Sequence, residues 1–296
     1  MTLMRAAGVA EFGAADRLRI VEVPRPVPGP GEVLVRVRAA GVQPADVAVR
    51  SGWLPPGAPP VEFPVVPGNE FAGIAEATGE AVVGFRTMRC YAEYVTVPES
   101  QVVPKPGGVD WAAAGALSAS GQTAHTALER LGLREGETLL VHGAAGGVGT
   151  MITQLAVRQG VRVVGTGSAA NQDYLADLGA TPVEYGDGEL DRLKEQGPFD
   201  SVLDAAGKGN LRTSVELVAD RARIGSIADW ELARELGCLW IGSDRNRGRL
   251  AELLDLVSAG ELRVNVRAAY PLEEAFQAHA DIETGHGRGK VVLIVG

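Results

Sequence analysis

Residues 137–168 read ETLLVHGAAGGVGTMITQLAVRQGVRVVGTGS and decide the fold of the surrounding chain. Thr138–His142 is mostly apolar and predicts a buried strand. Four glycines occupy the seven residues from Gly143 to Gly149. Apolar residues then recur at the spacing of a helix, at Val148, Ile152, Leu155 and Ala156. Since Val161–Gly165 predicts a second strand, the stretch forms a strand–turn–helix–strand unit.

The glycine-rich turn predicts a dinucleotide-binding site. In such a unit the glycines let the backbone approach a ligand closely, while the first N–H groups of the helix and its dipole face a diphosphate. When Gly146 and Gly149 are aligned with the last two glycines of the usual fingerprint, Ala144 takes its first position, and Gly143 can supply the tight turn. A merely structural turn is the alternative. The expected diphosphate contacts are Gly143, Ala144, Ala145, Gly146, Gly147, Val148 and Gly149.

The end of the second strand indicates which dinucleotide is bound. A site for NAD normally carries an Asp or Glu roughly 20 residues after the fingerprint. Here Ser168 stands at that distance, and the next carboxylate is Asp173. A hydroxyl and backbone N–H groups can donate to a 2′-phosphate that a carboxylate would repel. The sequence therefore favours NADP(H), although Ser168 can also, or instead, N-cap a helix over Ala169–Leu178.

Composition excludes several classes of protein. The chain of 296 residues is long enough for two domains, is 46% hydrophobic and carries a net charge of -9. This charge argues against a nucleic-acid or anionic-membrane partner, and no run of 18 apolar residues could span a bilayer. Cys90 and Cys238 lie too far apart in sequence to indicate a thiolate cluster. Without a signal-peptide pattern, we expect a cytoplasmic protein that acts on small molecules.

The segments on either side of the central unit have different patterns. Residues 1–117 predict short strands broken by Pro and Gly, and thus a β-rich, partly barrel-like domain. The expected strands include Leu3–Ala7, Glu32–Ala40, Gly73–Ala77 and Tyr91–Val97. After Leu117 strands alternate with helices, which predicts a doubly wound parallel sheet. Its later elements are the strands Phe199–Asp204 and Arg223–Ile227 and the helix Asn246–Ala259.

The C-terminal segment predicts a discontinuous first domain. A helix over Leu272–Glu283 and a strand over Val291–Val295 do not repeat the strand–helix alternation, so the last strand can return to the first domain. The predicted domains are therefore residues 1–117 with 265–296, and residues 118–264.

Several motifs together identify a family resemblance that covers nearly the whole chain. They read GEVLVRVRAAGVQPADVAVRSG, PGNEFAG, YAEYVTVP, HGAAGGVG, LGA, FDSVLDAAG and GRGKVVL. With them the chain resembles the medium-chain dehydrogenase/reductase superfamily, specifically its zinc-free, zeta-crystallin-like quinone oxidoreductase branch. The resemblance implies a GroES-like β-rich domain plus a Rossmann domain, NADPH bound in the cleft between them, and a homodimer.

The resemblance also allows a test for zinc. Zinc enzymes of the superfamily place a Cys in the loop that is Gly41–Asp46 here, and a His before the Glu of Gly68–Glu70. This chain instead offers Val42, Gln43 and Asn69, which cannot supply the three N or S ligands of a catalytic zinc. We therefore expect no metal, and a structural hydrogen-bonding role for Glu70.

The site residues implied by the resemblance fall into two groups. Gln43 matches a polar amide that faces nicotinamide and substrate, and Thr123 matches a helix residue beneath the cofactor. Tyr91 or water delivers the proton, and the sequence does not choose between them. Asn171 stands where many relatives have Lys, which removes a charge and predicts weaker selection of NADPH. The expected nucleotide contacts outside the turn are Ser168, Asn171, Tyr185 and Ile227.

The expected function is an NADPH-dependent reductase of quinones or α,β-unsaturated carbonyls, since no metal polarises the carbonyl and donors must meet the developing negative charge. A pathway-specific enoyl or polyketide reductase is an alternative, because the chain is shorter than the family pattern between Gly73 and Tyr91. A redox-inactive NADPH-binding sensor or scaffold is another, because Ala48 and Leu54 replace tyrosines that some relatives carry.

Overall fold

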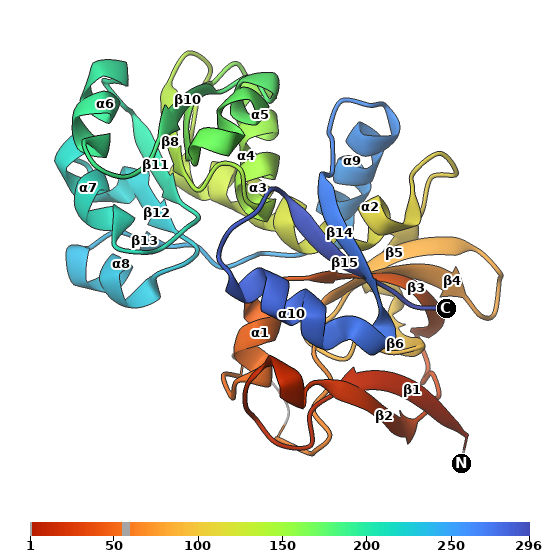
Figure 1. Cartoon of the computed structure of the whole chain (residues 1–296). Helices are drawn as coiled ribbons and strands as arrows, with labels where there is room; N and C mark the ends of the chain where they lie inside the picture. Colours follow the sequence, from red (N-terminus) through yellow and green to blue (C-terminus); the bar gives the residue numbers. More distant parts are fainter. Residues whose placement is uncertain (1, 55–59) are drawn as a thin grey trace. The chain divides into compact units, whose positions relative to one another are not determined.

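The computed structural model describes residues 2–54 and 60–296, which form two compact units (Figure 1). Unit 1 comprises residues 1–119, 245–286 and 290–296. Unit 2 comprises residues 120–244 and 287–289. Within the described ranges, no helix is both long enough and apolar enough to cross a bilayer.

Unit 2 is built on a parallel sheet of six strands in the order β10-β9-β8-β11-β12-β13. This order, with the first strand of the unit in the middle, is that of a Rossmann domain and confirms the doubly wound sheet. The central strand, Thr138–His142, is buried along its whole length, as expected for a mostly apolar strand of a parallel sheet. The strands are β8 (Thr138–His142), β9 (Arg162–Gly167), β10 (Thr181–Glu184), β11 (Ser201–Asp204), β12 (Ile224–Ser226) and β13 (Leu239–Trp240).

Helices cover both faces of this sheet. Figure 1 shows α4 and α5 on one face and α7 and α8 on the other. The predicted helix after the glycine turn is α4, and its inward residues Ile152 and Ala156 are completely buried. The helices are α3 (Ser118–Leu131), whose first two residues belong to unit 1, α4 (Gly147–Arg158), α5 (Gln172–Asp177), α6 (Glu189–Gln196), α7 (Asn210–Leu217) and α8 (Trp230–Leu236).

Unit 1 is built on a larger mixed sheet centred on β3 (Glu32–Val42). This long strand confirms the strand predicted over Glu32–Ala40 and pairs antiparallel with β4, β6 and β15. A separate antiparallel pair joins β1 (Leu3–Gly8) to β2 (Arg19–Pro24). The other strands of the sheet are β4 (Glu70–Ala75), β5 (Ala81–Phe85), β6 (Tyr94–Pro98), β7 (Val102–Pro104), β14 (Val266–Pro271) and β15 (Lys290–Ile294).

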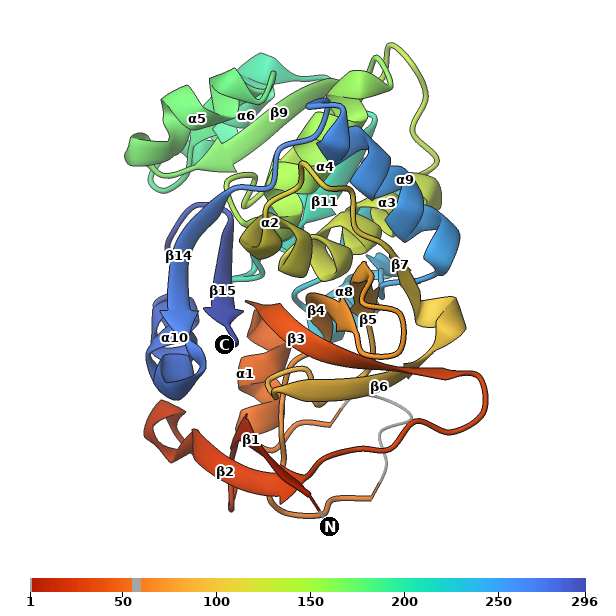
Figure 2. The same cartoon turned by 90° about the vertical axis from the view of Figure 1, so that its right-hand side faces the viewer.

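The C-terminal segment does return to unit 1, as predicted. Strands β14 and β15 pair in parallel, and α10 (Ala275–Glu283), which connects them, packs against both (Figure 2). Strand β15 then pairs with β3, so the last strand completes the sheet begun near the N-terminus. The other helices of unit 1 are α1 (Pro44–Arg50), α2 (Trp111–Gly115) and α9 (Arg247–Ser258).

Two segments group differently from the predicted domains. Helix α9 has the predicted bounds, with Asn246 as its N-cap, but it contacts β7 and belongs to unit 1 rather than to the Rossmann domain. Residues 287–289 belong to unit 2, because Gly289 forms an isolated bridge with Gly146 of the glycine turn. Both differences arise from contacts between segments distant in sequence, which periodicity does not encode.

Candidate functional site

The glycine turn of unit 2 has the backbone geometry that close approach to a ligand requires. Gly143 supplies the tight turn with a φ of +72°, as expected from its place beside Ala144. A Cβ at Gly149 would lie 2.2 Å from the carbonyl oxygen of Gly143, so only glycine lets α4 pack this closely on the turn. The Ala144 methyl group fits at the first fingerprint position because its neighbour on β9, residue 165, is a glycine. A Cβ at Gly165 would lie 2.7 Å from the Cβ of Ala144.

The turn is held by the neighbouring strand. Thr166 of β9 accepts hydrogen bonds from Gly143 N at 3.3 Å and Ala144 N at 3.0 Å. The first intrahelical bond of α4 runs from Thr150 N to Gly146 O at 2.8 Å, and the N-cap Gly146 has no side chain to cap the preceding N–H groups. These N–H groups and the helix dipole fit a diphosphate. The predicted contacts Ala145, Gly147 and Val148 lie within the same turn and first helical turn.

The loop after β9 carries the predicted 2′-phosphate residues. Ser168 occupies the N-cap position, but in the described part of the chain its hydroxyl makes no capping bond. Instead the Asn171 amide donates to Ser168 Oγ at 3.1 Å. Ser168 thus stands at the predicted N-cap position, but the predicted capping bond of its side chain is absent. Tyr185 follows β10, is half exposed, and its N–H donates to Gly167 O at 3.2 Å, which brings it beside the same loop.

The remaining predicted residues of unit 2 lie on other elements. Ile227 directly follows β12, and its N–H donates to Asp204 O at 3.1 Å. Thr123 lies in α3. Asp204, which we did not single out from the sequence, ends β11 and is completely buried; it accepts from Gly207 N at 2.9 Å and Ser226 Oγ at 2.9 Å. The signal for Asp204 that the sequence offered was an acidic residue at the end of a buried strand.

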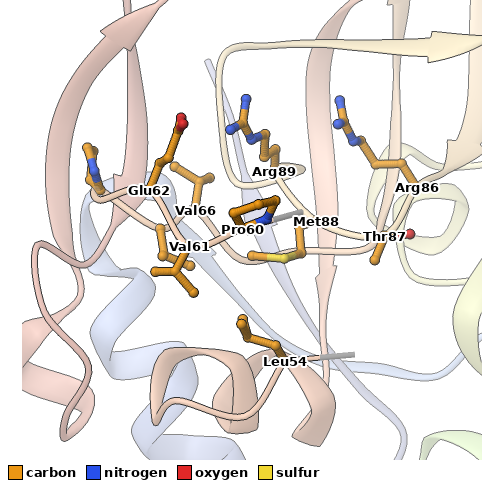
Figure 3. A pocket seen from close by; sticks show the side chains of 11 residues that line it. Leu54, Pro60, Val61, Glu62, Val66, Arg86, Thr87, Met88 and Arg89 are labelled. Atoms are coloured by element: carbon orange, nitrogen blue, oxygen red, sulfur yellow. The ribbon is translucent and has the colours of Figure 1, made fainter. Parts of the chain in front are cut away.

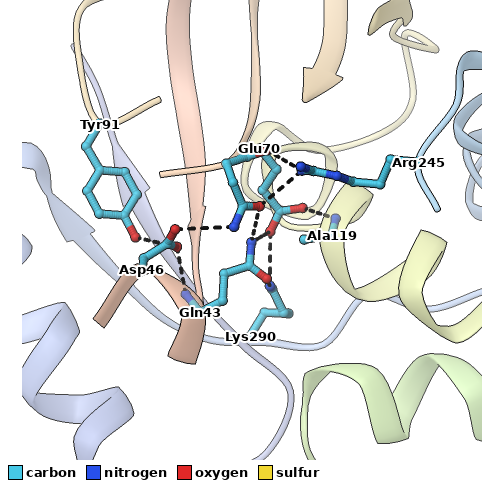
Figure 4. Close-up of polar contacts among 8 residues, drawn as sticks. Gln43, Asp46, Glu70, Tyr91, Ala119, Arg245 and Lys290 are labelled. Carbon is cyan, nitrogen blue, oxygen red and sulfur yellow. Dashed lines mark hydrogen bonds and ion pairs between the residues drawn. The ribbon is translucent and has the colours of Figure 1, made fainter. Parts of the chain in front are cut away.

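Unit 1 contains a buried group of hydrogen-bonded side chains, here called the polar cluster (Figure 4). Its centre is the completely buried Glu70, whose Oε1 accepts from Lys290 Nζ and from Gln43 Nε2, each at 3.0 Å. The Ala119 N–H donates to Glu70 Oε2 at 2.6 Å. These bonds confirm the structural role predicted for Glu70. The cluster comprises Gln43, Asp46, Asn69, Glu70, Tyr91, Arg245 and Lys290.

Gln43 uses its whole amide group inside the cluster. Its Nε2 donates to Glu70 and, at 3.0 Å, to Asn69 Oδ1, while its Oε1 accepts from Lys290 Nζ at 3.2 Å. A primary amide has two donor hydrogens. Gln43 can therefore donate to a substrate oxygen only by exchanging one of these bonds, and its catalytic role stays a prediction.

Tyr91 is joined to Gln43 through Asp46. The Tyr91 hydroxyl donates to Asp46 Oδ2 at 2.9 Å, and the Gln43 N–H donates to the same oxygen at 3.1 Å. Burial raises the pKa of Asp46 to about 7, against the lowering effects of the Tyr91 hydrogen bond and the Lys290 charge. Burial, then the charge of Asp46, also raises the pKa of Tyr91 well above its ordinary value. Asp46 thus joins the start of α1 to Tyr91, and Tyr91 is a buried residue whose proton faces Asp46.

The positions at which zinc enzymes of the superfamily carry ligands are part of the same network. Asn69 accepts from Gln43 and donates to Asp46 Oδ1 at 3.3 Å, and Arg245 donates to the Asn69 carbonyl oxygen at 2.8 Å. Among the residues described, no three His, Cys, Asp or Glu side chains converge on a possible metal position. We did not single out Lys290 or Arg245 from the sequence. The GRGKVVL motif contains Lys290, whereas nothing in the sequence marked Arg245.

A pocket in unit 1 is lined by Leu54, Val61 and Met88, with Glu62, Arg86 and Arg89 among its polar residues (Figure 3). None of the predicted site residues lines it. Leu54, one of the two residues that replace tyrosines of some relatives, contributes to its wall. We assign this pocket no ligand.

The family models and the curated relatives that match this chain agree with one another. Residues 29–107 match the alcohol dehydrogenase GroES-like domain, and residues 173–293 match a family described as zinc-binding dehydrogenase. A quinone oxidoreductase of Lama guanicoe is 31% identical over 99% of this chain and 98% of its own length.

Solved structures agree over the whole fold. The quinone oxidoreductase from Coxiella burnetii has a TM-score of 0.88 and 29% identity, covering 100% of both chains. Mycobacterial Rv1454c, whose structure is a complex with NADPH, has a TM-score of 0.83 and 31% identity, covering 98% of this chain and 99% of its own.

Proposed function

Because this chain is an oxidoreductase that belongs to the quinone oxidoreductase family of the medium-chain dehydrogenase/reductase superfamily, we propose that it reduces quinones or α,β-unsaturated carbonyls with NADPH and without a metal. The observation that carries the choice of NADPH is the loop after β9. It presents the Ser168 hydroxyl and the Asn171 amide, with no carboxylate before Asp173. The NADPH complex of Rv1454c supports the same choice.

The residues of unit 2 are suited to hold this cofactor. Gly143 and Gly149 would let the backbone approach the diphosphate, and N–H groups at the start of α4 would donate to it. Ser168, Asn171 and the half-exposed Tyr185 would hold the adenosine end. When bound, NADPH supplies the hydride, so the protein's contribution is binding, orientation and electrostatics.

The chemistry of the polar cluster supports the absence of a metal. The Lys290 ammonium group lies 3.0 Å from Glu70 Oε1 and 3.2 Å from Gln43 Oε1, and it repels a second cation at these oxygens. Gln43 and Asn69 offer amide groups, which are poor ligands for zinc beside thiolate or imidazole. We propose that Gln43 exchanges a hydrogen bond with Glu70 or Asn69 for one to the substrate oxygen, and that water or Tyr91 supplies the proton.

The test follows the NADPH absorbance with panels of quinones, enones and enoyl thioesters, before and after treatment with a chelator. We expect oxidation with quinones or enones that chelation leaves unchanged. Activity that is lost on chelation and restored by zinc would contradict the metal-free mechanism. Turnover confined to enoyl thioesters would favour the pathway-specific enzyme. Tight NADPH binding without any turnover would favour the sensor or scaffold.

The choice of cofactor has a separate test in Ser168→Asp. The new carboxylate would accept from a ribose 2′-OH and repel a 2′-phosphate, so we expect the preference to shift from NADPH to NADH by at least about tenfold. Dissociation constants for both nucleotides measure this shift. An unchanged preference would remove Ser168 from the site. The homodimer, the cytoplasmic location and the small-molecule partner stay predictions.

A further inference from the structure

The segment 287–289 reaches unit 2 from outside its continuous sequence and is attached to the glycine turn. Gly289 N donates to Ala145 O at 2.8 Å, and Gly289 forms an isolated parallel bridge with Gly146. Arg288 precedes Gly289 directly. The attachment of Gly289 to the glycine turn therefore fixes the backbone position of Arg288.

The Arg288 side chain extends to the loop after β9. Its Nε donates to Asn171 Oδ1 at 3.1 Å, and its Nη2 donates to Ala170 O at 3.0 Å. Its guanidinium carbon lies 4.6 Å from the centre of the Tyr174 ring, within the range of a cation–π contact. Asn171 in turn donates to Ser168 Oγ. Arg288, Asn171 and Ser168 thus form one hydrogen-bonded row along this loop.

This arrangement brings a positive charge to Asn171, whose own side chain has none. Asn171 stands where many relatives have Lys, which predicted weak selection of NADPH. The structure places a permanent positive charge at the same residue, supplied by a side chain 117 positions later in the sequence. A guanidinium group is suited to phosphate because its planar array of N–H donors can form two parallel bonds with phosphate oxygens.

We propose that Arg288 is the residue that selects a 2′-phosphorylated nucleotide, by pairing with the 2′-phosphate beside Ser168 and Asn171. The proposal rests on the proposed function, since it assumes that the glycine turn binds a dinucleotide. Asn171 then has the role of orienting the guanidinium group rather than of contributing charge. The neighbouring carboxylate Asp173 is exposed on the first turn of α5, where solvent screens it.

The test compares NADPH and NADH as probes, because they differ only in the 2′-phosphate. Binding is measured from the nucleotide fluorescence, without substrate, for the full-length wild type and for Arg288→Ala and Arg288→Lys. We expect Arg288→Ala to weaken NADPH binding about 10- to 100-fold and to leave NADH binding unchanged, as for loss of a charged hydrogen-bonding partner. Arg288→Lys should recover part of the loss, and raising the salt concentration should weaken NADPH binding to the wild type more than to Arg288→Ala.

The outcomes separate this proposal from the proposed function. The matched control is Arg212→Ala, which removes an exposed arginine that pairs with Glu235 on the other face of the sheet. If Arg288→Ala weakens NADPH and NADH equally, Arg288 only shapes the loop and the inference is overturned. If the wild type prefers NADPH and Arg288→Ala keeps that preference, the inference fails while the proposed function stands. If the wild type binds neither nucleotide, the proposed function itself fails.

Discussion

The glycine turn of unit 2 and the polar cluster of unit 1 are built in opposite ways. The turn uses backbone groups from seven consecutive residues, and its side chains are hydrogen atoms or small apolar groups. The cluster uses side chains from five separate segments, with a carboxylate and an ammonium group buried together. A site made of backbone groups depends on local geometry, so it is disrupted when an added side chain fills the space beside the backbone. A buried charged network fails when one partner is removed, because the other is left uncompensated.

The largest expected effect comes from breaking the ion pair of Glu70 and Lys290. Each of Glu70→Gln and Lys290→Met leaves a buried charge without its partner, and we expect each to lower the free energy of unfolding by about 3–5 kcal/mol. The double variant should lose less than the sum of the two. Denaturant unfolding, monitored at several wavelengths because two units are present, measures these changes.

The exposed lysine of α6 supplies the control, since Lys194→Met should change stability by less than about 0.5 kcal/mol. Additive losses in the double variant would mean that Glu70 and Lys290 do not act as a pair.

The second effect should be confined to the turn. In Gly149→Ala the new methyl group meets the Gly143 carbonyl oxygen, and relief of this clash must move α4 away from the turn. We expect at least about a tenfold loss of NADPH affinity and a destabilisation of about 1–3 kcal/mol. Nucleotide fluorescence and thermal unfolding measure the two quantities.

Gly242→Ala is the matched control, because a Cβ there has no neighbour within 4 Å. Should Gly149→Ala bind NADPH like the wild type, the close packing of helix on turn is not what the nucleotide requires.

The third comparison is the pH dependence of stability, for which two buried groups of unit 1 give opposite signs. Burial raises the pKa of Asp46 from 3.8 to about 7, so its contribution is present below pH 3.8 and is lost as the pH rises through 7. Burial, then the Arg50 charge, lowers the pKa of His279 from 6.5 to about 3, so its contribution is present above pH 6.5 and is lost as the pH falls toward 3.

Melting temperatures between pH 4 and 8 test these signs. Relative to wild type, Asp46→Asn should gain stability as the pH rises, and His279→Gln should gain stability as the pH falls. Parallel profiles for the wild type and both variants would show that neither group titrates differently in the folded protein. His286→Gln serves as the control, because this histidine is exposed.

The sequence predicted individual elements of both units well because the information for them is local. The bounds of β8 match the prediction, and the predicted helix Asn246–Ala259 is α9 with its two cap residues. Gly143 was expected to supply the turn, and its φ of +72° confirms this. Ser168 was placed correctly before a helix, but the predicted capping bond of its side chain is absent.

The sequence by itself determined the strand–turn–helix–strand unit, because hydrophobic periodicity and glycine positions act through neighbouring residues, and its motifs determined the family. Only the tertiary structure decided which charges meet. Lys290 reaches Glu70 across 220 residues and Arg288 reaches Asn171 across 117, although the two basic residues are separated by one glycine. Their partners depend on how β15 pairs with β3 and how Gly289 meets the glycine turn, and these are contacts between segments that no local pattern specifies.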